Sequence, residues 1–85
     1  MNRYTVVWSE EAEDELAVIW LQAHDRQAVT KAQATIDARL ETDPVNNSID
    51  VAEGLRKIVV PPLIAFFSVE LTQHLVEVNQ VARIP

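Results

Sequence analysis

The last third of the sequence constrains the fold most, because it holds three consecutive apolar runs joined by very short connectors. The runs cover residues 55–60, 63–71 and 75–84, and they begin just after the only glycine of the chain, Gly54. Pro61-Pro62 separates the first two runs, and proline lacks the N–H that a strand interior must donate. Thr72-Gln73-His74 separates the second from the third. Connectors this short predict an antiparallel meander of three strands.

The first half of the chain predicts one strand followed by a helix. Large side chains alternate at Tyr4, Val6 and Trp8, as in a strand with one buried face. Ser9 can then cap a helix, and five carboxylates follow within residues 10–15, where those nearest the terminus offset the helix dipole. The apolar residues of this helix share one face. They are Ala12, Leu16, Ile19, Trp20 and Ala23. We expect Trp8 and Trp20 in the core, or partly exposed as anchors for a partner.

A second helix is predicted over residues 26–41, capped by Asp25 and ended by Asp43-Pro44. Its buried stripe consists of Val29, Ala32, Ile36 and Leu40. The two helices, at 10–23 and 26–41, should form a hairpin, and residues 49–53 should lead into the meander. The fold class predicted is therefore α+β, in the order β-α-α-β-β-β, with the helix hairpin packed on one face of a mainly antiparallel four-stranded sheet.

Size and charge limit the function. With 85 residues the chain should be a single domain, 1–85, and no segment approaches the ~20 apolar residues of a membrane helix, so we expect a cytoplasmic protein. The net charge is −6, and residues 1–50 carry the whole excess, with ten carboxylates against four basic side chains. Generic nucleic-acid binding is disfavoured. There is no cysteine, and His24 and His74 lack companions at ligand spacing, so no metal or other cofactor is expected.

The order of elements and three local motifs resemble the RelE/ParE family of bacterial toxins. The opening residues 4–9, followed by Ala12, Asp14 and Leu16, are similar to the family's first strand and acidic helix start. Asp43-Pro44 and the later Glu53-Gly54-Leu55-Arg56 are similar to its approach to the second strand. Val76, Val78, Val81 and Arg83 are similar to its last strands.

This resemblance implies the toxin of a type II toxin-antitoxin module, held in a hetero-complex by a small antitoxin. One branch of the family cleaves messenger RNA on the ribosome with basic side chains on the sheet and often a C-terminal Tyr or His. The other inhibits DNA gyrase. Arg56 and Arg83 match basic positions of the cleaving branch, so the resemblance implies them as catalytic or target-contact residues, with Lys57 as a further binding residue.

Departures from the cleaving branch favour a toxin of the gyrase-directed branch. The third-strand position that carries arginine in that branch is apolar here, at Ile64, and the chain stops at Pro85 without a C-terminal Tyr or His. Arginine stays protonated and cannot act as a base. Lys57 should face away from Arg56, and His74 should lie about 30 Å along the strand from Arg83. We therefore expect a toxin that binds its target, with a ribosome-dependent endoribonuclease or a degenerate member retaining only antitoxin binding as alternatives.

Overall fold

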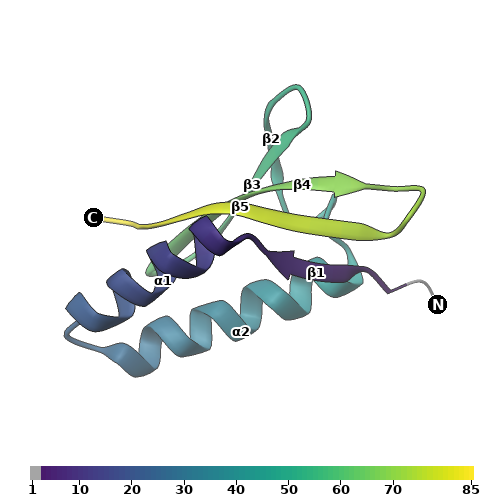
Figure 1. Ribbon diagram of the computed structural model, residues 1–85. Coiled ribbons are helices and arrows are strands. Elements are labelled where there is room, and N and C mark those ends of the chain that lie inside the picture. Colours follow the sequence, from purple (N-terminus) through teal and green to yellow (C-terminus); the bar gives the residue numbers. More distant parts are fainter. Residues whose placement is uncertain (1–2) are drawn as a thin grey trace.

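The computed structural model describes residues 3–85, which form two helices and five strands (Figure 1). In chain order these are β1 (Thr5–Trp8), α1 (Glu10–Gln22), α2 (Arg26–Thr42), β2 (Ile49–Ala52), β3 (Leu55–Val60), β4 (Leu63–Glu70) and β5 (Leu75–Arg83). The α+β class, the helix hairpin and the meander of β3, β4 and β5 are confirmed. Both predicted helices agree with the observed ones to within one residue.

The sheet has five strands in the order β1-β5-β4-β3-β2, so the expectation of four strands is wrong. The additional strand is β2, which pairs antiparallel with β3 through Ile49 and Lys57 and through Asp50 and Arg56. Its four residues hold only two large apolar side chains, and a bulge between Asp50 and Ala52 interrupts the pairing. A strand of only four residues with an interrupted pairing has almost no signature in the sequence, and it exists because β3 offers a free edge.

The chain closes the other side of the sheet by a parallel pairing. β1 runs parallel to β5, with Val6 opposite Val76 and Trp8 opposite Val78, while all other neighbours are antiparallel. A parallel pair needs a long crossover, and α1, α2, β2, β3 and β4 together provide it. The first and last strands of the chain therefore lie side by side.

Both helices pack on one face of the sheet, which leaves the other face open (Figure 1). Side-chain caps start them as predicted: the Ser9 hydroxyl accepts a hydrogen bond from the Ala12 N–H at 3.1 Å, and the Asp25 carboxylate accepts one from the Ala28 N–H at 3.0 Å. Each cap satisfies an N–H that has no partner within its helix.

The core between the helices and the sheet is formed by twelve buried apolar residues. They are Ala12, Val29, Ala32, Ile36, Leu40, Ile58, Leu63, Ala65, Phe67, Val76, Val78 and Val81. The stripe predicted for α2 is thus confirmed, and Trp8, Leu16 and Ile19 pack against this core while remaining partly exposed. The expectation of a buried Trp20 is wrong. The residue is 40% exposed, and the Arg26 guanidinium lies over its ring at 4.6 Å from the ring centre.

Candidate functional site

The pairing register assigns each predicted site residue to one face of the sheet. Arg56 is opposite Phe67 and Arg83 is opposite Leu63, and both of these partners are fully buried under the helices. Directly paired residues share a face, so both arginines lie on the helix side. Lys57 is opposite Phe66 and therefore lies on the open face, away from Arg56 as predicted.

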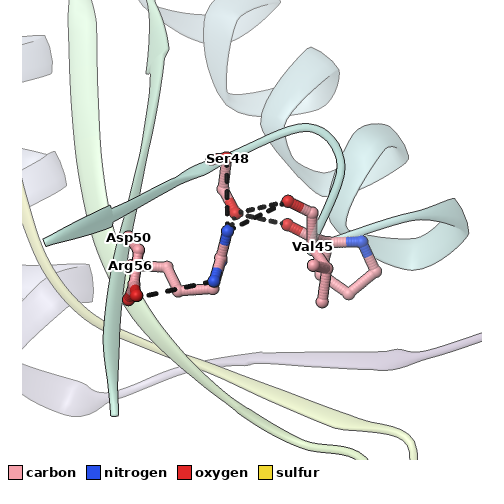
Figure 2. A network of polar contacts seen from close by, with 5 residues as sticks. Val45, Ser48, Asp50 and Arg56 are labelled. Atoms are coloured by element: carbon pink, nitrogen blue, oxygen red, sulfur yellow. Dashed lines mark hydrogen bonds and ion pairs between the residues drawn. The ribbon is translucent and has the colours of Figure 1, made fainter. Parts of the chain in front are cut away.

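Arg56 is held by the segment that leads into β2 (Figure 2). Its Nε donates to the Ser48 hydroxyl at 2.7 Å, and one terminal nitrogen donates to the carbonyls of Val45 at 3.2 Å and Ser48 at 3.4 Å. The other terminal nitrogen is 3.9 Å from the Asp50 carboxylate. All three guanidinium nitrogens are engaged within the protein, and the side chain is only 23% exposed. Arg56 therefore fixes the loop before β2 and has little capacity left for a ligand.

Arg83 is in a different environment at the end of β5. Its side chain is exposed and forms no ion pair or side-chain hydrogen bond with any residue in the range 3–85. It borders a hollow of about 380 Å³ between the helix hairpin and the β3–β4 turn, which is also lined by His24, Asp25 and Pro62. It is a free cation at the margin of the helix side.

The structure does not bring the predicted catalytic arginines together. Their partners Phe67 and Leu63 are four residues apart on β4, and two strand spacings separate β3 from β5. The Cα atoms of Arg56 and Arg83 are therefore roughly 16 Å apart, and the Arg56 side chain is turned toward β2. His74 lies in the turn before β5, at the opposite end of that strand from Arg83, as predicted. No single small site can contain these three groups.

The open face is mostly apolar at its centre. Val59, Ile64, Phe66 and Ala82 lie on neighbouring strands there, and Val7 extends the apolar surface toward β1. Val59 is 42% and Val7 is 44% exposed. Among the described strand residues on this face, Lys57 is the single basic side chain, whereas Glu70 and Glu77 are both acidic. The face therefore provides a surface for apolar contact and little positive charge.

A half-buried carboxylate on α2 was not anticipated from the sequence. The Trp8 indole N–H donates to the Asp37 carboxylate at 2.7 Å and so ties β1 to α2. Burial raises the pKa of Asp37, the Trp8 hydrogen bond lowers it, and the negative charge of Glu41 raises it further, for a net upward shift. Nothing in the sequence marks Asp37 or Ser48, because their partners are separated from them in the chain or are backbone atoms.

Within residues 3–85 no group of three or more His, Asp or Glu side chains is arranged to hold a metal ion. No described helix has both the length and the apolar character needed to span a membrane.

Comparison with solved structures identifies the fold. The chain is similar to a chain of the toxin-antitoxin complex RelBE2 from Mycobacterium tuberculosis, with a TM-score of 0.81, 13% identity, and coverage of 98% of this chain and 93% of that one. It is similar to a chain of the chromosomal ParDE system of P. aeruginosa, with a TM-score of 0.72, 14% identity and 98% coverage of both chains. It is similar to the isolated RelE toxin of E. coli, with a TM-score of 0.67, 16% identity, and coverage of 96% and 85%.

No protein-family model and no curated protein matches the sequence. The resemblance in fold predicted from the sequence is confirmed: the chain has the RelE/ParE-like fold over nearly its whole length.

Proposed function

We propose that the protein is the toxin of a type II toxin-antitoxin module, that it acts by binding a macromolecular target as in the gyrase-directed branch, and that a cognate antitoxin neutralises it. The fold supports the toxin role, because all three structural neighbours described above come from toxin-antitoxin systems. Their identities of 13–16% do not distinguish the RelE from the ParE branch. The choice of mechanism therefore rests on the side chains of this chain.

The composition of the open face carries that choice. Cleavage of RNA by its 2′-oxygen requires a base, an acid, and cations that stabilise the charge on the phosphorane. Among the described strand residues, Lys57 is the single basic side chain of the open face, which also carries Glu70 and Glu77 and is apolar at its centre. Arg56 is occupied by Ser48 and Val45. An apolar face with one cation suits contact with a protein better than contact with a polyanion.

The main alternative is a ribosome-dependent endoribonuclease of the same fold, with Arg83 and Lys57 as its cations. General acid and base groups each contribute about 10²- to 10⁴-fold, so a site without both retains only part of the rate enhancement. The second alternative is a degenerate member that keeps only antitoxin binding. These three functions predict different results in cells.

The experiment is induced expression with and without the adjacent reading frame, followed by growth, primer extension on messenger RNA, and plasmid supercoiling. The proposal predicts growth arrest relieved by the adjacent gene, altered supercoiling and no defined cleavage. Substituting Val59→Glu on the open face should abolish arrest, whereas the matched change Val18→Glu, at an exposed position of α1, should not. Codon-specific cleavage lost in Lys57→Ala or Arg83→Ala would establish the endoribonuclease instead. Absence of arrest would favour the degenerate member.

A further inference from the structure

We infer that the free edge of β2 is a docking site for an extended, lysine- or arginine-bearing segment of a partner protein, which adds to the sheet as a sixth strand. This inference rests on the proposed function only for the existence of a protein partner. It assigns a place on the molecule and a chemistry to that partner, neither of which follows from the fold class.

β2 is exposed in the way that strand addition requires. It lies at one end of the sheet and pairs only with β3, so one side of its backbone faces away from the sheet. All four of its residues are exposed, with Ile49 at 61% and Val51 at 46%. In Figure 1 the β2–β3 hairpin projects away from the helical layer, so neither helix covers this edge. An edge strand with unpaired N–H and C=O groups and exposed aliphatic side chains is a template for another strand.

A hollow beside the free edge of β2 can hold one side chain of the added strand and determines which kind of side chain fits there. It has a volume of about 200 Å³, and its lining includes Asp50 and Arg56, which the pairing register places on the helix side of β2 and β3. Its apolar lining is supplied by Val45, Leu55, Val69 and Leu71, and the Asp50 carboxylate stands at the same site. A residue placed opposite Asp50 by strand addition would project to this side.

The Asp50 carboxylate is available for a partner. Within residues 3–85 it forms one ion pair, with Arg56, which is long at 3.9 Å, and its side chain remains 73% exposed. A lysine or arginine of the added strand can lay its aliphatic stem on the apolar lining and bring its charge to Asp50. Arg56 assists by position: its bonds to Val45 and Ser48 hold the loop that forms one wall.

Charge identifies the partner as basic. The protein carries a net charge of −6, and Glu53 adds a second carboxylate at the end of β2. A second copy of the same chain is disfavoured, since pairing β2 with itself would bring Asp50 and Glu53 of both copies together. The shared edge would also be four residues, about 13 Å, which is short for the roughly 1,200 Å² that a stable interface buries.

The test is a selection from a random ten-residue peptide library displayed on phage, performed on the intact protein. Selected peptides are then synthesised and their affinity is measured by calorimetry at 50 and 500 mM salt. Hydrogen exchange locates the binding site. Three further proteins are measured: Asp50→Asn, Ile49→Lys, which puts a charge on the edge, and the control Asp14→Asn, an exposed aspartate on α1. Circular dichroism confirms that each variant is folded.

The expected peptides alternate β-branched residues with Lys or Arg, slow the exchange of amides in residues 49–52, and bind more weakly at high salt. Asp50→Asn should weaken binding about three- to tenfold and Ile49→Lys at least as much, with Asp14→Asn unchanged. The inference is overturned if no peptide is enriched, if the enriched peptides are acidic or amphipathic helices, or if both β2 variants bind as wild type does. Concentration-dependent protection of residues 49–52 without peptide would identify a second copy as the occupant and also overturn it. Loss of the toxin function in cells would leave these binding results standing, so the two proposals can fail separately.

Discussion

Replacing Arg56 by alanine separates its structural role from the catalytic one that its position in the sequence implied. The substitution removes three hydrogen bonds, to the Ser48 hydroxyl and to the carbonyls of Val45 and Ser48, together with the long ion pair to Asp50. The substitution Arg83→Ala is the matched control. That side chain is exposed and forms no bond of this kind within residues 3–85.

The expected loss for Arg56→Ala is about 2 kcal/mol. A hydrogen bond to a charged group contributes about 1.5 to 3 kcal/mol, but the freed acceptors lie near the surface, where water replaces part of each bond. The ion pair adds little, because Asp50 is 73% exposed. For a domain of this size 1 kcal/mol corresponds to about 4 to 8 °C, so the midpoint of thermal unfolding should fall by about 8 to 16 °C. Arg83→Ala should change stability by no more than about 0.5 kcal/mol.

Urea unfolding followed by circular dichroism measures both variants, and hydrogen exchange localises the change. Arg56→Ala should speed exchange in residues 45–52, because the side chain holds that segment against β3. Arg56→Lys should lie between wild type and alanine, since an ammonium keeps the charge but lacks the forked geometry of a guanidinium. Equal stability of Arg56→Ala and Arg83→Ala, with unchanged exchange in residues 45–52, would refute this account of Arg56.

Three other perturbations test the core, the half-buried carboxylate and a turn. Leu40→Ala should cost about 2 to 5 kcal/mol by urea unfolding, because Leu40 is fully buried, and Leu16→Ala should cost less, because Leu16 is partly exposed; equal costs would contradict the assigned burial. Asp37→Asn keeps an oxygen for the Trp8 indole and removes a carboxylate charge that burial disfavours, so it should raise the unfolding midpoint at pH 7. The pKa of Asp37 is raised by folding, so the stability that its protonated form contributes is complete below the usual pKa of about 3.9 and is lost as pH rises through the folded pKa. The advantage of Asp37→Asn should accordingly shrink as pH falls through that window, and an advantage independent of pH would exclude the charge as its cause. Gly54→Ala should cost about 1 to 2 kcal/mol in the same unfolding assay, because Gly54 has a φ of 77° and no crowding atom that would add to the cost; an unchanged midpoint would mean that the turn rearranges.

The arrangement of helices, the meander and the helical part of the core could be predicted from the sequence because their signals are local. Ser9 and Asp25 cap the helices through atoms three residues away. The spacing of Val29, Ile36 and Leu40 marks one helix face whatever lies opposite it. Alternation along β3 likewise predicted that Arg56 and Lys57 point to opposite faces of the sheet, although it did not identify the partners of either side chain.

Only the tertiary structure decided which segments meet. β2 pairs because β3 has a free edge on that side, and its own four residues are too few to predict a strand from the sequence. Trp20 fits the apolar stripe of α1, yet it is 40% exposed and lies outside the core, with the Arg26 guanidinium over its ring. Arg56 matches a catalytic position in sequence, but its role depends on Ser48 and Val45, which reach it only when the loop folds back. Periodicity says which side of an element is apolar, whereas burial and pairing depend on what covers that side, and that is a property of the assembled fold.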